Sequence, residues 1–231
     1  MGNGTTERAR DPRAPVEGPP GPRRRTAVLI SGRGSNLAAL MRAAADPTYP
    51  AEIALVISNR ANAPGLGLAR NAAIPTAVIE QRGRERAAHE AAIDAALVHH
   101  EVEFVCLAGY LRVLTPFLVE RWRGRMLNIH PSLLPAFPGL ETHARALAAG
   151  VKLHGCTVHL VAERVDAGPI LVQAAVPVLP TDSAENLAAR VLLQEHRIYP
   201  LGLAMLAGAA VSGSPPDSAL LNPLPAFVPV P

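Results

Sequence analysis

Short apolar runs alternate with helix-like segments along the first half of the chain. The runs are rich in Val, Ile and Leu, as buried strands are, and the segments between them space apolar residues three and four apart, as helices do. We expect strands at residues 27–31, 53–58, 76–79 and 103–108, and helices at 36–45, from about 64, at 84–99 and at 115–122. Strands that alternate with helices form parallel sheets covered on both faces. The pattern therefore predicts an α/β fold with a Rossmann-like, mostly parallel twisted sheet.

The second half of the chain has a different pattern. The expected elements are a strand at 126–129, a helix at 142–149, strands at 156–162 and 170–178, and helices at 184–196 and 198–208. Gly150 is suited to end the first of these helices, and Thr181, Asp182 and Ser183 are suited to cap the start of the second. Two strands joined by a turn follow a first half in which strands and helices alternate. This arrangement predicts a site between the two halves of one sheet.

Prolines are concentrated at the two ends of the chain. Residues 1–25 and 213–231 hold 11 of the 23 prolines, which predicts two Pro-rich tails around one domain at 26–212. We divide this domain into an N-terminal phosphate-binding half, about 26–125, and a C-terminal catalytic half, about 126–212. The formal net charge of +3 arises in the basic first tail, which has six arginines and three acidic residues. The domain is therefore balanced in charge, and the pI near 9.3 does not indicate a nucleic-acid surface.

Membrane and export signals are weak. The longest apolar run, 201–211, is about half of a membrane span. The arginines at 23–25 precede an apolar run, as in a twin-arginine signal, but that run ends within five residues. Of the two cysteines, Cys106 lies in an apolar run, which favours a buried reduced thiol over a disulfide with Cys156. We expect a cytoplasmic protein with small-molecule substrates and neither membrane nor nucleic-acid partners.

The sequence Ser-Gly-Arg-Gly-Ser-Asn at residues 31–36 lies between a predicted strand and a predicted helix. Glycines allow the backbone to approach an anion, and the N–H groups at a helix start bind phosphate. Leu37 stands where the dinucleotide-binding motif has its third glycine, and no Gly-Lys-Ser/Thr follows, which excludes both common nucleotide motifs. The residues predict a monophosphate site, and a purely structural turn is the alternative left open.

Asn128 and His130 are two apart in a predicted strand and so share one face at its carboxyl end. An amide donor and an imidazole there suit oxyanion stabilisation and proton transfer, although a structural histidine stays open. Asp166 lies in a predicted turn, and a carboxylate close to a histidine favours the imidazolium, but the sequence does not place the two together. Cys156 and His159 resemble metal ligands, yet strand alternation sends them to opposite faces, so we expect no zinc.

These segments together resemble the glycinamide ribonucleotide formyltransferases, the folate-dependent enzymes of purine biosynthesis. The resemblance extends over about residues 27–200 and is carried by motifs in the family's order and spacing. The motifs are the loop at 31–36, AGYLRVL at 108–114, NIHPSLLP at 128–135 continuing to PGL at 138–140, DAGPI at 166–170 and QEHRIYP at 194–200.

The resemblance implies a formyltransferase fold and transfer of a formyl group from the cosubstrate 10-formyltetrahydrofolate to the amine of glycinamide ribonucleotide, without a metal. By matching position, Gly34, Ser35 and Asn36 would bind the substrate phosphate and Glu195 its amine. The implied catalytic residues are His130, Asn128 and Asp166. The implied folate-binding residues are Arg84, Leu111, Arg112, Val113, Leu114, Asn128, Ala162, Glu163, Arg164, Val165 and Asp166.

Two positions depart from a simple match. Arg82, Arg84 and Arg86 compete for one folate contact, and Arg33 stands where the family has small or amide residues. Methionyl-tRNA formyltransferase is disfavoured, because the residues after about 212 contain no Lys or Arg and do not form an RNA-binding domain. Formyltetrahydrofolate hydrolase is disfavoured, because the first tail is too short for its regulatory domain. A formyltransferase for sugar nucleotides, a non-catalytic folate- or nucleotide-binding protein, and a homodimeric state all stay open.

Overall fold

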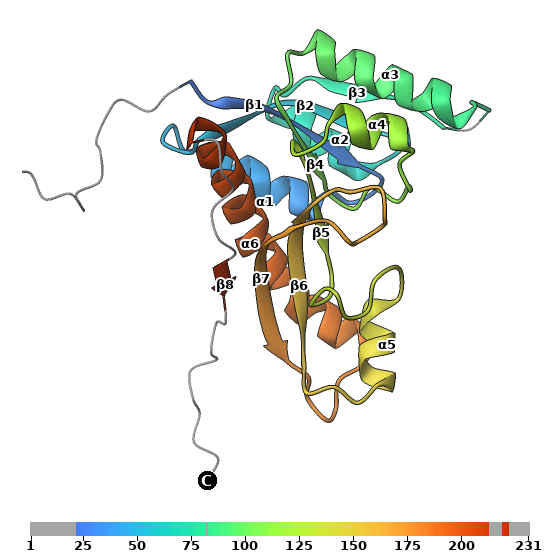
Figure 1. The fold of residues 1–231 in the computed structure, drawn as a ribbon, viewed down its shortest axis with the longest axis vertical. Coiled ribbons are helices and arrows are strands. Elements are labelled where there is room, and N and C mark those ends of the chain that lie inside the picture. Colours follow the sequence, from blue (N-terminus) through green and yellow to red (C-terminus); the bar gives the residue numbers. More distant parts are fainter. Residues whose placement is uncertain (1–21, 82, 213–218, 222–231) are drawn as a thin grey trace, which may run out of the picture.

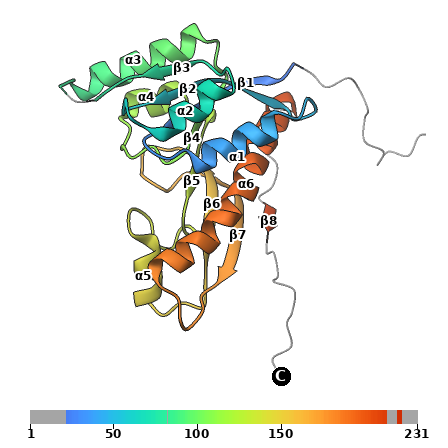
Figure 2. The same ribbon diagram turned by 180° about the vertical axis from the view of Figure 1, so that it is seen from behind.

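One eight-stranded sheet runs through the described part of the chain, which comprises residues 22–81, 83–212 and 219–221 of this computed structural model. Figures 1 and 2 show helices on both faces of this sheet. The strands are β1 (Arg24–Ile30), β2 (Ala51–Ser58), β3 (Thr76–Val78), β4 (Phe104–Leu107), β5 (Met126–His130), β6 (Leu153–Leu160), β7 (Ile170–Pro177) and β8 (Ala219–Leu221). The helices are α1 (Ser35–Ala44), α2 (Pro64–Asn71), α3 (Arg86–His99), α4 (Pro116–Arg121), α5 (Thr142–Ala148) and α6 (Ala184–Ser212).

The sheet has the order β3-β2-β1-β4-β5-β6-β7-β8. The strands β1 to β5 are parallel, whereas β6 runs antiparallel to both β5 and β7. The α/β prediction with a mostly parallel sheet is therefore confirmed. The strand order reverses at β1, which pairs with β2 on one side and β4 on the other. The carboxyl ends of β1 and β4 consequently border the crevice where α/β sheets bind ligands.

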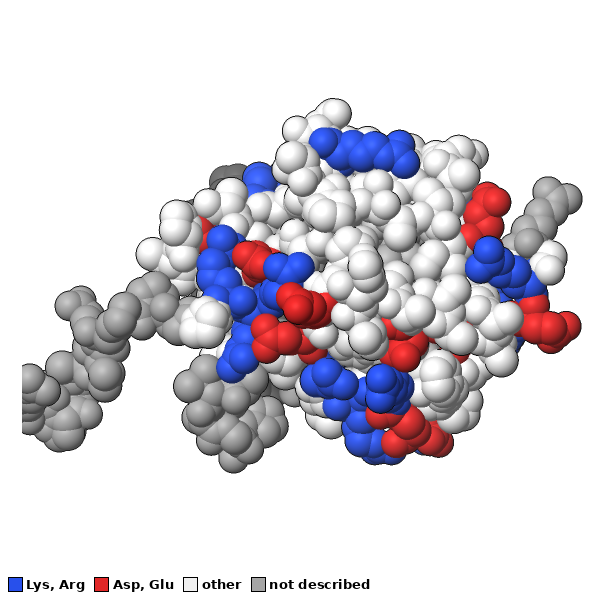
Figure 3. All heavy atoms as spheres, turned by 90° about the horizontal axis from the view of Figure 1, so that it is seen from above, with Lys and Arg blue, Asp and Glu red and all other residues white. Residues whose placement is uncertain are grey.

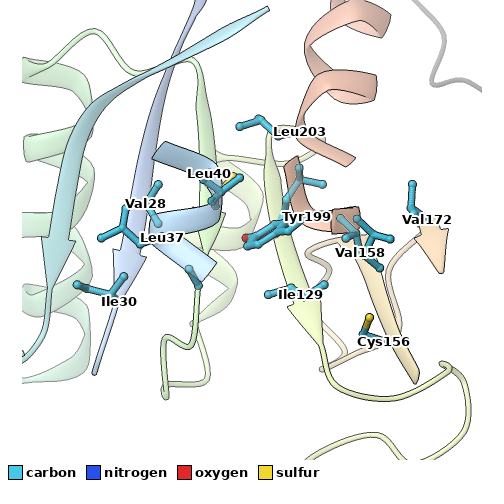
Figure 4. Packing of buried hydrophobic residues seen from close by; sticks show 14 of the residues in the cluster. Val28, Ile30, Leu37, Leu40, Ile129, Cys156, Val158, Val172, Tyr199 and Leu203 are labelled. Carbon is cyan, nitrogen blue, oxygen red and sulfur yellow. The ribbon is translucent and has the colours of Figure 1, made fainter. Parts of the chain in front are cut away.

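Alternation along β1 supplies both hydrophobic cores. Val28 and Ile30 enter the first core, which lies under α1, α2 and α6. Ala27 and Leu29 enter the second core, which lies under α3 and α4. Tyr199 of α6 joins the helix to the sheet, because its hydroxyl donates to the carbonyls of Leu107, at 3.0 Å, and Leu127, at 3.3 Å. In Figure 4 the Tyr199 ring lies inside the first core, among side chains from α1 and β5. The middle of α6 is thereby fixed against β4 and β5, the strands that carry the site.

The helix α6 corrects one prediction, since it is continuous where two helices were expected. Pro200 lies inside it and removes one backbone hydrogen bond. Tyr199 and Leu203, both fully buried, hold the helix on the sheet on either side of that proline. Packing therefore outweighs the lost bond. The predicted cap is present, because the Ser183 hydroxyl accepts the N–H of Asn186 at 3.2 Å.

The first strand begins at Arg24, three residues before the predicted strand and inside the predicted first tail. Arg23 donates to the carbonyls of Tyr49 at 3.1 Å, Ala51 at 2.6 Å and Ala44. The Pro-rich composition predicted a tail here, but the Arg23 guanidinium satisfies backbone carbonyls at the end of the sheet. Within the second predicted tail, 219–221 pair with β7 as β8. The tail residues 1–21, 213–218 and 222–231 lie outside the described residues.

Arg23 should therefore contribute to stability. We expect Arg23→Ala to lower the free energy of unfolding by about 2 kcal/mol, because carbonyl groups lose a charged donor. Arg24→Ala is the matched control, since the Arg24 side chain forms a partly exposed ion pair with Glu103 and should cost at most about 1 kcal/mol. Chemical denaturation measures both values. If both variants lose an equal and negligible free energy of unfolding, Arg23 does not stabilise the fold and belongs to the tail.

The surface shows no block of one charge sign on the face drawn in Figure 3, where basic and acidic side chains are interspersed. This agrees with the balanced charge expected for the domain. Among the described residues, the helices are too short or too polar to cross a membrane. Cys106 and Cys156 are both buried free thiols.

Candidate functional site

Two adjoining cavities lie at the carboxyl ends of β1, β4 and β5. The smaller, about 130 Å³, lies between the loop after β1 and the loop after β4. The larger, about 700 Å³, extends from there past the end of β5 to the segment between β6 and β7. Asn36 and Gly109 line both cavities. A ligand with an anionic end and a second reactive end could therefore occupy both.

The predicted phosphate loop forms one wall of the smaller cavity. Gly34 has a φ of +78°, and a Cβ atom added to it would lie 2.8 Å from the Cα of Gly65 in α2. Any side chain at this position is thus both strained and obstructed. Ser35 and Asn36 follow at the start of α1, where backbone N–H groups lack helical partners. Arg33 also lines the cavity and is the only charged residue among those that do so in the described chain.

The side chain of Asn36 has an unexpected partner. Its Nδ2 donates to Oε2 of Glu195, on α6, at 2.6 Å. Burial raises the pKa of the Glu195 carboxyl, and the hydrogen bond from Asn36 partly opposes this effect. Glu195 lines the larger cavity, as its predicted contact with the substrate requires.

His130 and Asp166 lie side by side, a proximity that the sequence could not establish. Nδ1 of His130 is 3.5 Å from Oδ2 of Asp166, and its Nε2 is 3.0 Å from the carbonyl oxygen of Phe137. Both ring nitrogens therefore face acceptors, and only Nδ1 has an acceptor that is itself charged. Oδ2 of Asp166 also accepts the N–H of Gly139 at 2.8 Å. The carboxylate thus fixes both the histidine and the loop that follows it.

His159 orients the third predicted catalytic residue, Asn128. The two are paired across β5 and β6, with Nδ2 of Asn128 at 3.1 Å from Nε2 of His159. Nδ1 of His159 is 2.9 Å from the carbonyl oxygen of Leu160 and must donate to it. Burial lowers the pKa of His159, so the ring is neutral and its Nε2 accepts from Asn128. One amide hydrogen of Asn128 is held by this bond, and the other is available to a ligand.

The sequence drew attention to His159 only as a metal ligand. Cys156 points into the first core, whereas His159 lines the larger cavity, so the expected opposite placement is correct. Within the described residues, no three His, Cys, Asp or Glu side chains are grouped to hold a metal. The only signal for the actual role of His159 was its position in a predicted strand, and it becomes informative once β6 is paired with β5, which places His159 opposite Asn128.

Most predicted folate-binding residues line the larger cavity. Leu111 and Val113 are 65% and 54% exposed, and they line this cavity together with the exposed Leu140, so the cavity has an apolar patch on its wall. The other predicted residues that line it are Arg112, Leu114, Asn128, Ala162, Glu163, Val165 and Asp166. Arg84 and Arg164 are exposed and are not among the lining residues, and their folate contacts stay predictions.

The loop that carries Leu111 and Val113 is held at both ends by α3. The imidazole of His89 is 2.9 Å from the hydroxyl of Tyr110, and the carboxylate of Glu90 accepts the N–H of Thr115 at 2.8 Å. Neither α3 residue was singled out from the sequence, because a buried His-Glu pair in an Ala-rich helix carries no motif. The apolar wall of the larger cavity is therefore anchored rather than free.

A histidine pair borders the same cavity. Nε2 of His154 is 3.2 Å from Nδ1 of His143, which is among the lining residues. Burial, reinforced by His143, lowers the pKa of His154 to about 4. The His154 ring is consequently neutral at physiological pH and adds no positive charge beside His130.

The chain is similar to known formyl transferases over most of its length. A family model for formyl transferases matches residues 24–203. The chain is 51% identical over 188 residues to the trifunctional purine biosynthetic protein adenosine-3 of Bos taurus, which covers 81% of this chain and 19% of that protein. It is 47% identical over 179 residues to the phosphoribosylglycinamide formyltransferase of Haemophilus influenzae, which covers 77% of this chain and 84% of that enzyme.

The chain is also similar to a solved structure of a bacterial enzyme. The phosphoribosylglycinamide formyltransferase of Brucella melitensis has a TM-score of 0.77 and 56% identity, over 80% of this chain and 96% of that one. The chain thus spans about a fifth of the bovine protein but most of each bacterial enzyme. The resemblance drawn from the motifs is confirmed, and the chain belongs to the formyl transferase family, among the phosphoribosylglycinamide formyltransferases.

Proposed function

We propose that this chain transfers the formyl group of 10-formyltetrahydrofolate to the amine of glycinamide ribonucleotide. The observation that carries the proposal is the pair of adjoining cavities. One has an anion-binding loop, and the other has an apolar wall with Asn128, His130 and Asp166 beside it. The phosphate of the ribonucleotide suits the first cavity, and the folate ring system suits the second, where its apolar faces meet Leu111 and Val113.

The proposed reaction is an acyl transfer. The amine nitrogen attacks the formyl carbon, and the carbonyl oxygen becomes an oxyanion that Nδ1–H of His130 and the free amide hydrogen of Asn128 stabilise. The bond between the formyl carbon and the folate nitrogen then breaks. A proton leaves the attacking amine and the folate nitrogen gains one, so that tetrahydrofolate and the formylated ribonucleotide result. Asp166 lies close enough to His130 to stabilise positive charge on its ring.

Two further features fit this reaction. The carboxylate of Glu195 accepts hydrogen bonds and so suits the N–H groups of the substrate amine. The free, buried thiols of Cys106 and Cys156 suit a reducing compartment, and we expect the protein in the cytoplasm.

An assay of tetrahydrofolate release tests the proposal. Release should depend on added glycinamide ribonucleotide, with formylation of its amine seen by mass spectrometry. Release without any amine would indicate a hydrolase, and release with an amino-sugar nucleotide alone would indicate the alternative formyltransferase. Binding without turnover would indicate a folate- or nucleotide-binding protein.

The phosphate loop gives a sharper prediction. Gly34→Ala should raise the KM for glycinamide ribonucleotide about tenfold or more, because the left-handed backbone and the contact with Gly65 both resist a methyl group. Gly32→Ala is the matched control, since a Cβ there meets nothing within 4 Å. Steady-state kinetics, with folate binding measured separately, checks both variants. Equal loss of folate binding in folded Gly34→Ala would contradict a loop dedicated to phosphate.

A further inference from the structure

We infer that the Asn36 side chain positions the carboxylate of Glu195 and serves the amine end of the site, while only its backbone serves the phosphate. This inference rests on the proposed function. Asn36, one of the residues predicted to bind the phosphate, thus has two roles: its backbone binds phosphate and its side chain holds Glu195. The loop after β1 is thereby coupled to α6. Asn36 is therefore a positioning residue for Glu195, and its Oδ1 offers the amine a second acceptor.

The hydrogen bond between these residues is short and enclosed. Asn36 and Glu195 are only 9% and 8% exposed, and their side chains meet at 2.6 Å although they are 159 residues apart in the sequence. Their helices, α1 and α6, pack against each other. The amide must present Nδ2 to the carboxylate, because Oδ1 in that place would set one acceptor against another. The amide nitrogen is thus committed to Glu195.

The remaining atom of the amide indicates what it can bind. Oδ1 of Asn36 is buried and has no hydrogen-bond partner among the described residues. It lies in a residue that lines both cavities, next to a carboxylate. A phosphate offers only acceptors and negative charge, so these oxygens would repel it. An amine offers N–H donors, and it satisfies both Oδ1 and the carboxylate.

The electrostatic surroundings make Glu195 sensitive to Asn36. The nearby titratable groups are the thiol of Cys156 from β6 and the phenol of Tyr199 from α6, and burial raises the pKa of both, so they stay neutral. Asn36 therefore supplies the hydrogen bond that favours the ionised carboxyl against the cost of burial. Its removal should raise the pKa of Glu195 further. Glu195 would then be ionised, and able to accept from the amine, only at higher pH.

The test compares Asn36→Ala with Ser35→Ala, its neighbour in the same loop. In Asn36→Ala, the acidic limb of kcat/KM for glycinamide ribonucleotide should move to higher pH, with about a tenfold loss on that limb. Inorganic phosphate should inhibit this variant as strongly as it inhibits the parent. Ser35→Ala removes a hydroxyl from a residue that lines the smaller cavity, so it should weaken phosphate inhibition and leave the acidic limb of kcat/KM unmoved.

Direct titration of Glu195 makes the test independent of turnover. Other ionisable side chains, among them His130 and Asp166, line the same cavity, so NMR of ¹³C-labelled glutamate, assigned with Glu195→Gln, identifies the group that titrates. A higher titration midpoint for Glu195 in Asn36→Ala supports the inference even if the ribonucleotide is not the substrate. An unchanged midpoint, or weakened phosphate inhibition with an unmoved acidic limb, overturns it.

Discussion

His130→Gln should lower kcat about 10²–10³-fold and leave folate affinity close to that of the parent. The expected loss follows from the direction of the ring, since Nε2 is turned to the Phe137 carbonyl and Nδ1 faces Asp166 and the cavity. A glutamine amide can replace Nε2 and keep the bond to Phe137, but it has no atom in the place of Nδ1. The variant thus removes the donor proposed to stabilise the oxyanion and little else.

His130→Asn is the complementary variant. Its shorter amide can place a nitrogen near the position of Nδ1, and it loses the bond to Phe137 instead. We expect it to retain more kcat than His130→Gln. Stopped-flow measurement of single turnovers separates the chemical step from product release, and calorimetry gives folate affinity. A greater loss in His130→Asn would mean that Nε2, or the loop that it holds, matters more than Nδ1.

The sequence was most informative where local spacing alone decides geometry. The alternation of strands and helices predicted the parallel half, and the two-residue spacing of Asn128 and His130 placed them on one face of β5. The glycines around Arg33 indicated an anion loop, which the cavity beside it supports. These features depend on neighbours within a few residues, so no tertiary information was needed.

Features that depend on residues far apart in the sequence could not be predicted from local spacing. The continuity of α6 through Pro200 depends on Tyr199 reaching carbonyls of β4 and β5. The start of β1 at Arg24 depends on guanidinium partners that are distant in the sequence. The pairing of Asn128 with His159 depends on the register between β5 and β6. In each case a local signal was present, and its partner could be known only from the fold.

Asp166→Asn should lower kcat about 10²-fold with little change in thermal stability. Asp166 has a φ of +55°, a left-handed conformation that asparagine adopts more easily than most residues, so the turn should persist. The asparagine Oδ1 can still accept the N–H of Gly139, which Asp166 binds at 2.8 Å. The negative charge 3.5 Å from Nδ1 of His130 is what disappears. The expected loss of kcat therefore reports the effect of the Asp166 charge and not a change in the shape of the loop.

Asp166→Ala separates the two roles of this carboxylate. It removes the charge and also releases Gly139, so we expect a similar loss of kcat together with a higher KM for folate and a lower melting temperature. Kinetics and thermal unfolding of both variants give the comparison. Should Asp166→Asn keep nearly full activity while Asp166→Ala loses it, Asp166 would act only by anchoring the loop. Loss of kcat in both, with folate binding lost only in Asp166→Ala, assigns the charge to the reaction and the Gly139 bond to the folate cavity.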